Sequence, residues 1–198
     1  MPQRGVGTAM RELVMTENIT VDGVIDASGG WFQPGDSGDI DVTDLVDVIG
    51  EQMRAADAFL VGRVTFEEMR GYWPLQTDDQ TGVSDYLNQV AKYVVSSTMN
   101  EPGWPNSTVL SGEMAAEVRA LKERPGGDIV TTGSMQLAHS LIGAGLVDEY
   151  RLFVYPVVLG TGARLFEAAD LGALSLVEAR PFGSGVVLLT YRPTTPAN

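Results

Sequence analysis

Residues 59–70 read FLVGRVTFEEMR, and this stretch holds the pattern that decides the fold. Its first three residues form a short apolar run typical of a buried strand, Gly62 interrupts the run, and a helix is predicted over residues 65–70. The same order of strand, glycine and helix recurs at residues 129–142, IVTTGSMQLAHSLI. Strands that alternate with helices in this way predict a largely parallel sheet with helices on both faces.

The rest of the chain continues the alternation and then changes to strands alone. Further strands are predicted at residues 13–20, 93–95, 108–110 and 129–131, and further helices at residues 43–55, 83–90, 113–123 and 136–142. Near the C-terminus a strand-like run at 149–158 is broken by Pro156, and two runs at 174–179 and 186–192 flank a turn rich in glycine. The predicted class is α/β: a mixed, mostly parallel central sheet, helices on both faces and a C-terminal antiparallel hairpin.

Length and composition predict one domain. The chain has 198 residues, of which 44% are hydrophobic, enough to bury a full core. A second plausible start lies at Met10, so residues 1–9 are predicted to be a flexible N-terminal extension. The domain is expected over residues 10–193, followed by a flexible tail at residues 194–198.

Composition also limits the chemistry. The absence of cysteine excludes disulfides, thiolate zinc sites and a thiol nucleophile. A formal charge of −13 disfavours binding to nucleic acid and to anionic membranes, so the expected ligand is a small molecule held in a locally favourable site. No apolar run approaches the roughly 20 residues that span a bilayer, and residues 1–9 lack the features of a signal peptide, so a cytoplasmic location is predicted.

Three strand ends carry the functional argument, because ligands of open α/β sheets bind beyond the carboxyl ends of the strands. At the first, Gly62 allows close backbone approach, the helix start offers free N–H groups, and Arg63 presents a fork that fits phosphate. An ordinary helix start capped by Thr65 explains this junction equally well. The second strand end comprises Ser96, Ser97 and Thr98, whose hydroxyls also fit an ordinary turn. The third comprises Thr132, Gly133, Ser134, Gln136 and Leu137, where Ser134 also fits an ordinary N-cap. Together the three ends predict a site for a phosphate-bearing nucleotide.

Six segments, taken in order, carry a resemblance: residues 21–25 (VDGVI), 60–67 (LVGRVTFE), 93–98 (YVVSST), 133–137 (GSMQL), 145–150 (GLVDEY) and 156–162 (PVVLGTG). Between residues 10 and 193 the chain resembles the dihydrofolate reductase superfamily. The closer similarity is to the bacterial branch that includes the reductase domain of riboflavin biosynthesis.

The resemblance implies an NADPH-dependent reductase that transfers a hydride to a small molecule, heterocycles included. It assigns Arg63, Thr65, Ser96 and Ser97 to the adenosine side of the cofactor, Thr132, Gly133 and Ser134 to the pyrophosphate, and Asp22 and Gly23 to the active site near the nicotinamide. Asp22 and Gly23 also fit an ordinary tight turn. Many relatives have a basic residue at the position of Ser97, which places more weight on Arg63 for the 2′-phosphate.

A homodimer is implied by the same resemblance. The sequence itself also supports a dimer, because the apolar runs at residues 152–154 and 186–189 contain more apolar residues than are needed to cover one face of the sheet. We therefore expect the dimer to form through the C-terminal antiparallel strands.

The substrate side is predicted in the variable loop at residues 27–38, where Trp31 and Phe32 either line a pocket for a flat substrate or anchor the loop to the core. Asp44 is the candidate carboxylate of the helix at 43–55, although stabilising that helix N-terminus by roughly 0.3–1 kcal/mol is the favoured interpretation. His139, the single histidine, is assigned to packing or to the surface.

The acidic cluster Asp36, Asp39, Asp41 and Asp44 lacks the spacing of a calcium loop, so no metal site is predicted. Two alternatives to an enzyme remain open: a non-catalytic NADPH-binding sensor, and a structural dimer that has lost the site.

Overall fold

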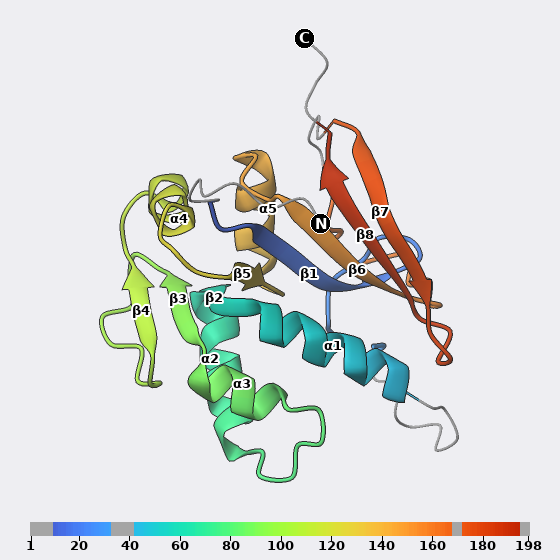
Figure 1. Ribbon diagram of the computed structural model, residues 1–198, viewed down its shortest axis with the longest axis horizontal. Coiled ribbons are helices and arrows are strands. Elements are labelled where there is room, and N and C mark those ends of the chain that lie inside the picture. The colour runs from blue at the N-terminus through green and yellow to red at the C-terminus, as the bar shows by residue number, and fades with distance from the viewer. Residues whose placement is uncertain (1–9, 33–41, 168–171, 195–198) are drawn as a thin grey trace, which may run out of the picture.

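The computed structural model describes residues 10–32, 42–167 and 172–194, and its centre is one eight-stranded sheet (Figure 1). The strands are β1 Leu13–Thr20, β2 Ala56–Gly62, β3 Ala91–Val95, β4 Ser107–Leu110, β5 Asp128–Thr131, β6 Glu149–Tyr155, β7 Leu174–Pro181 and β8 Val187–Pro193. Their order across the sheet is β4-β3-β2-β5-β1-β6-β8-β7. From β4 to β6 every neighbouring pair is parallel, and β8 and β7 continue the sheet with antiparallel pairs.

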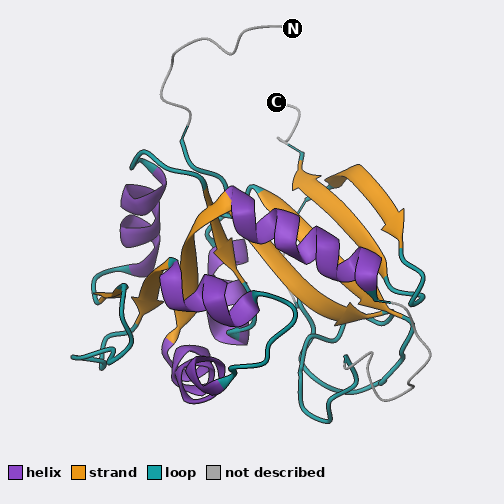
Figure 2. Cartoon of the chain, turned by 60° about the horizontal axis from the view of Figure 1, so that its bottom comes forward, coloured by secondary structure: helices purple, strands orange, loops and turns teal. Residues whose placement is uncertain are grey.

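Helices cover both faces of this sheet (Figure 2). They are α1 Thr43–Ala55, α2 Arg63–Tyr72, the short 3-10 helix η1 Trp73–Leu75, α3 Val83–Gln89, α4 Met114–Lys122 and α5 Met135–Gly143. Successive side chains of a strand point to opposite faces, so Leu13 packs in the core formed with α4 and α5, whereas Val14 packs in the core formed with α2 and α3. α1 lies on the same face as α2 and α3, where Leu45 and Val48 cluster with Phe153 of β6.

The fold class predicted from the sequence is confirmed, and several boundaries agree with the prediction. β1 and α1 have the predicted bounds, and β6 ends at Tyr155, directly before Pro156. α2 begins at Arg63 rather than Thr65, and Gly62, in an extended conformation, stands at its N-cap. Residues 1–9 and 195–198, and the acidic positions Asp36, Asp39 and Asp41, lie outside the described residues.

The amino edge of the sheet is tied by charged side chains. Lys122 of α4 pairs with Asp148, whose carboxylate also accepts a hydrogen bond from the N–H of Leu13 at the start of β1. At the same edge Arg192 of β8 binds the carboxylates of Glu12 and Glu149. These pairs fix how the strands start and leave the opposite, carboxyl edge to carry other functions.

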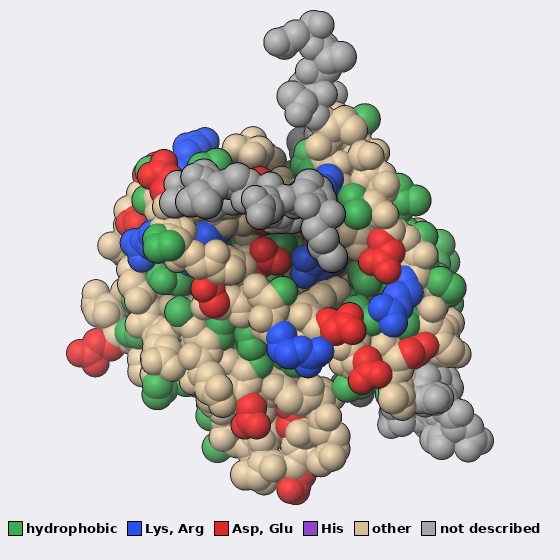
Figure 3. All heavy atoms as spheres, viewed as in Figure 1, with side chains coloured by type: hydrophobic (Ala, Val, Ile, Leu, Met, Phe, Trp, Pro, Cys, Tyr) green, Lys and Arg blue, Asp and Glu red, His purple; other side chains and the backbone are tan. Residues whose placement is uncertain are grey.

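The surface is acidic overall, in keeping with the net charge of −13. On the face drawn in Figure 3, Lys and Arg side chains are scattered among Asp and Glu rather than gathered in one patch. Within the described ranges, no helix has the length and apolar character needed to cross a membrane.

β7 is an edge strand that presents apolar side chains to solvent. Leu176 and Val177 are 55% and 56% exposed. The apolar runs that motivated a dimer in the sequence are instead largely used within the chain: Phe153 and Leu188 pack under α1, and Leu152 packs in the core shared with α5. Among the C-terminal antiparallel strands, the exposed apolar side chains therefore lie one strand further out, on β7.

We expect the homodimer to form through β7, and Leu176→Lys to break it by placing a charge on the exposed edge. Light scattering at micromolar concentration should then fall from twice the 21.2 kDa chain mass to a single chain. Leu75→Lys, at an exposed side chain of η1, is the control and should leave the dimer intact. A wild-type chain that scatters as a monomer would contradict this prediction.

Candidate active site

The junctions after β2 and β5 are joined by hydrogen bonds at the carboxyl edge of the sheet, where these two strands are neighbours. The N–H of Gly62 donates a hydrogen bond to Ser134 Oγ at 3.0 Å, and the N–H of Ser134 donates to Thr65 Oγ1 at 3.1 Å. The first and third junctions identified in the sequence are therefore one structure, although 72 residues separate Gly62 from Ser134.

The start of α5 is an open helix N-terminus. Gly133 and Ser134 both have positive φ angles, of 60° and 54°, and a Cβ atom on Gly133 would lie 3.3 Å from Thr65 Cγ2. Ser134 stands at the N-cap, but no side chain caps α5, because Ser134 Oγ accepts its hydrogen bond from Gly62 instead. The expectation of an ordinary serine cap is therefore wrong for the side chain. The first turn of α5 keeps N–H groups that suit an anion.

The residues that follow at this helix start divide between surface and core. The side chain of Gln136 is exposed, whereas that of Leu137 is buried in the core below α5. A contribution of Leu137 to ligand binding is thus restricted to its backbone.

The second junction lies beside the first, because Gly62 at the end of β2 is paired with Val95 at the end of β3. Ser96 is buried, and its Oγ accepts hydrogen bonds from the N–H groups of Thr98 and Met99 at 3.2 and 3.0 Å, as the turn interpretation expects. The side chains of Ser97 and Thr98 are exposed at this edge.

Arg63 is the first residue of α2 and pairs with Glu67 one turn later, with 2.8 Å between Nη1 and Oε2. Both side chains are about two-fifths exposed, at 43% and 40%. An exposed pair of this kind contributes about 0–1 kcal/mol, so a phosphate can compete with Glu67 for the guanidinium.

β1 separates from β5 at this same edge. Their pairing ends at Met15 and Thr131, while β1 continues to Thr20 in contact with β6 alone. β5 turns away into the Gly133 turn, and this divergence opens a gap beside residues 16–18 of β1.

Glu17 fills the gap from the side of α5. It is 4% exposed; its Oε2 accepts a hydrogen bond from the N–H of Gly133 at 3.1 Å, and its Oε1 has no hydrogen-bond partner among the described residues. Burial raises the pKa of Glu17 to about 8, so the carboxyl carries a proton at neutral pH.

Glu17 was missed in the sequence, although a signal was present. It is the charged residue in the otherwise uncharged strand LVMTENIT, and it alternates in phase with the buried Leu13 and Met15. A charged residue at an inward-facing position of a central strand is itself an indication of a site.

Asp22 and Gly23 form a tight turn that fastens the loop after β6. Asp22 accepts hydrogen bonds from the Thr20 hydroxyl at 2.6 Å and from the N–H of Gly160 at 2.8 Å, and Gly23 has a φ of 84°. The Thr20 hydrogen bond first, and the Gly160 hydrogen bond next, lower the pKa of Asp22 to about 2. The carboxylate is thus ionised and suited to holding the loop rather than to donating a proton.

A cavity of about 250 Å³ lies on the face covered by α1, α2 and α3, next to the gap between β1 and β5. Its wall includes Thr16, Glu17 and Asn18 of β1 and Thr132 of the junction after β5. Thr132 thereby connects the predicted nucleotide edge to the cavity. The remaining lining residues are Leu45, Ile49, Gln52, Met53, Phe59, Met69, Trp73, Val83, Tyr86, Leu87, Val130, Phe153 and Tyr155.

Trp31 and Phe32 stand behind this wall. The ring of Trp31 meets those of Phe32 and Tyr155 edge to face, with centroids 5.5 and 5.6 Å apart, and both residues pack against the core under α1. Their position agrees with the anchoring interpretation. It also makes them the support of Tyr155, which does line the cavity.

Asp44 and His139 lie outside the cavity wall. Asp44 Oδ2 accepts a hydrogen bond from the N–H of Gly183 at 3.0 Å, and Asp44 Oδ1 accepts one from the N–H of Leu45 at 2.8 Å. Asp44 thus joins the start of α1 to the β7–β8 turn. His139 Nε2 lies 2.8 Å from the carbonyl oxygen of Arg164, as a packing role predicts.

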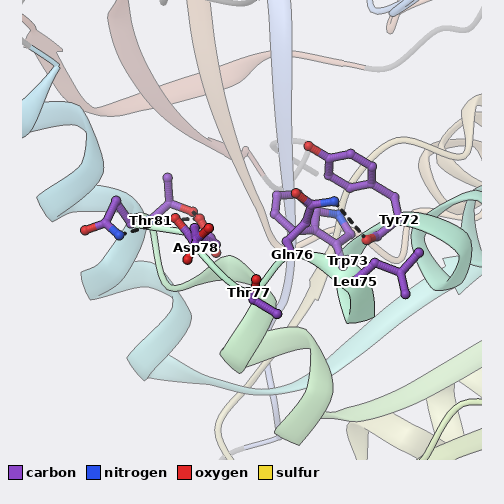
Figure 4. A pocket seen from close by; sticks show the side chains of 9 residues that line it. Tyr72, Trp73, Leu75, Gln76, Thr77, Asp78 and Thr81 are labelled. Carbon is purple, nitrogen blue, oxygen red and sulfur yellow. Dashed lines mark hydrogen bonds between the residues drawn. The ribbon is translucent and has the colours of Figure 1, made fainter.

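A second hollow, of about 570 Å³, is formed by residues 72–81 alone (Figure 4). Several of its polar groups form hydrogen bonds within the same segment of the chain. Asp79 accepts hydrogen bonds from Thr81 and Ser84, and Gln76 donates one to the carbonyl of Tyr72. None of its lining residues belongs to a strand or to the three junctions, so the candidate active site is the cavity beside Glu17.

The raised pKa of Glu17 predicts a pH-dependent stability. The folded chain keeps a proton between pH 4.5, the ordinary pKa, and about pH 8, whereas the unfolded chain releases it, so stability should fall as pH rises through this window. The Tm of Glu17→Gln should fall less than that of the wild type as the pH is raised across that range. Glu68→Gln, at an exposed glutamate of α2, controls for the lost charge and should melt with the wild-type pH dependence.

Comparison with known proteins supplies the family. The family described as the RibD C-terminal domain matches residues 11–188. The uncharacterized protein YyaP of Bacillus subtilis (strain 168) is 33% identical over 189 residues, which cover 91% of this chain and 94% of YyaP.

Solved structures agree on the fold. A pyrimidine reductase-like protein of Corynebacterium diphtheriae superposes with a TM-score of 0.64 at 17% identity, covering 93% of this chain and 92% of its own. The diaminohydroxyphosphoribosylaminopyrimidine deaminase/5-amino-6-(5-phosphoribosylamino)uracil reductase of Thermotoga maritima superposes with a TM-score of 0.62 at 17% identity, covering 93% of this chain and 57% of its own.

The match over nearly the whole chain, together with a sheet whose carboxyl edge holds the interlocked junctions of β2 and β5, means that this protein belongs to the RibD C-terminal domain family.

Proposed function

We propose that this protein is an NADPH-dependent reductase that transfers a hydride to a small molecule bound in the 250 Å³ cavity. The observation that carries the proposal is the lock between Gly62, Thr65 and Ser134, which leaves the N-terminus of α5 open directly beside that cavity. Membership of the RibD C-terminal domain family, and the reductases among proteins of the same fold, support it.

The residues present fit a dinucleotide phosphate. Gly133 allows the backbone to turn closely over Thr65, and the first turn of α5 provides backbone donors for a pyrophosphate. Arg63, Ser97 and Thr98 lie at the neighbouring junctions and provide a guanidinium and two exposed hydroxyls for the adenosine side. Backbone donors and one arginine offset the repulsion that the chain's net charge would otherwise impose on a polyanion.

Each further group has a role in this scheme. NADPH, when bound, supplies the hydride. Glu17 in its protonated form places a neutral carboxyl beneath the Gly133 turn, so no buried negative charge opposes the cofactor. Asp22 holds the loop after β6 in place, and because it is ionised, we assign the proton that completes the reduction to water.

NADPH binding should be visible as thermal stabilisation. A ligand at 100 times its dissociation constant adds about 2.7 kcal/mol to the free energy of unfolding, or roughly 5–10 °C in Tm for a domain of this size. Differential scanning fluorimetry with millimolar NADPH and NADH tests this. The absence of a shift with either nucleotide would exclude the proposed cofactor.

Arg63→Ala should weaken NADPH far more than NADH, because the guanidinium is assigned to the 2′-phosphate that NADH lacks. We expect a loss of about tenfold or more in NADPH affinity by calorimetry, equivalent to about 1.4 kcal/mol, with NADH changed less than threefold. Arg119→Ala, at an exposed arginine of α4, is the matched control. Equal losses for both nucleotides would mean that Arg63 contacts the shared pyrophosphate or serves the fold.

The protein should be a poor dihydrofolate reductase. Asp44, the candidate for pairing with a pterin ring, is bound to Gly183 and is not part of the cavity wall. We expect feeble dihydrofolate turnover that Asp44→Asn changes little. Efficient turnover that collapses in Asp44→Asn while NADPH binding persists would overturn this assignment.

A further inference from the structure

The cavity beside Glu17 has walls that limit what it can bind. This inference rests on the proposed function, in which the same cavity holds the substrate. The sheet contributes Phe59, Phe153 and Tyr155, and the helical side adds the rings of Trp73 and Tyr86. Aromatic walls on opposing elements favour a flat ligand, which can lie against ring faces.

Every polar group on the wall is uncharged at neutral pH. Thr16 and Thr132 offer hydroxyls, and Asn18 and Gln52 offer amides that can both donate and accept. Glu17 is the acid of the wall, and burial raises its pKa to about 8, which keeps it protonated. Among the described residues that line the cavity, none is Lys, Arg or His.

This chemistry opposes an anionic occupant. A phosphate or carboxylate that leaves water without a cationic partner loses solvation that neutral amides do not replace.

The size of the cavity sets the scale of the ligand. An apolar cavity of roughly 150 Å³ is large enough for benzene. At about 250 Å³ this cavity has room for one or two fused rings. Drug-sized ligands occupy larger pockets, of about 300–1,000 Å³.

We propose that the substrate is an uncharged, planar carbonyl compound of one or two rings, without a phosphate, recognised by Asn18 and Gln52 between the aromatic walls. In the reduction the carbonyl carbon takes the hydride and the carbonyl oxygen takes a proton. NADPH and one proton are consumed, and the alcohol and NADP⁺ are formed. The substrate class thus differs from a phosphoribosylated pyrimidine.

The preference for an uncharged ligand can be tested with a pair of probes that differ in charge. Isatin is a neutral two-ring lactam with a ketone, and isatin-5-sulfonate is the same ring system with one negative charge. Calorimetry on the full chain, with and without NADP⁺, should show isatin binding at least tenfold more tightly than isatin-5-sulfonate or uridine 5′-monophosphate. Equal or tighter binding of either anion, or no measurable binding of isatin, would overturn the proposal.

The thermal shift with NADPH is measured on the same samples and separates this inference from the proposed function. A normal NADPH shift without isatin binding refutes the substrate class and leaves the reductase proposal standing. The absence of any NADPH shift refutes the reductase proposal and, with it, the inference that depends on it.

A charge placed in the wall should reverse the preference. Gln52→Arg adds a cation to the cavity and should shift the affinity ratio at least tenfold toward isatin-5-sulfonate, with the NADPH shift retained as evidence of folding. Glu51→Arg, at the adjacent exposed position of α1 outside the wall, makes a larger charge change and should leave the ratio unchanged. A similar shift in both variants would show that the overall field, and not the cavity, selects the ligand.

Discussion

The parallel pairing of β1 with β5 on one side and β6 on the other is the constraint on which the rest of the structure depends. It sets the carboxyl ends of distant strands side by side. Because the pairing with β5 stops at Met15 and Thr131, the sheet opens there, and Glu17, the Gly133 turn and the cavity gather around the opening. A sheet paired fully to its edge would leave no such gap.

Charge is divided between the two edges of the sheet. At the amino edge, carboxylates bind Arg11, Lys122 and Arg192, so these ion pairs serve the fold. At the carboxyl edge the groups around the junctions and the cavity are backbone N–H groups, hydroxyls, amides, a protonated carboxyl and the guanidinium of Arg63. Under the proposed function, this division accounts for how a strongly acidic chain would hold a polyanionic cofactor, since the local environment differs from the overall field.

Much of the fold could be predicted from the sequence, because the spacing of apolar residues within each segment indicates whether it forms a strand or a helix. The bounds of β1 and α1 and the C-terminal hairpin follow from alternation and turn residues. The junctions at Gly62 and Gly133 could also be found, but not the bond between them, which depends on β2 and β5 being neighbours. Glu17 and the cavity could not be predicted in this way, because they depend on the direction of one side chain and on α1, α2 and α3 meeting the sheet around the same cavity.

The central place of β1 has a consequence for biosynthesis. Of the eight described strands it is made first, yet its partner β6 ends at Tyr155, and Glu17 meets Gly133 across 116 residues. Until those segments have been made, a strand rich in apolar residues has both edges free, which is the condition in which nascent chains aggregate or recruit chaperones. Contacts of such long range also slow the folding of the finished chain. The carboxyl edge around Glu17 and Gly133 is therefore completed late, after β6 has been made.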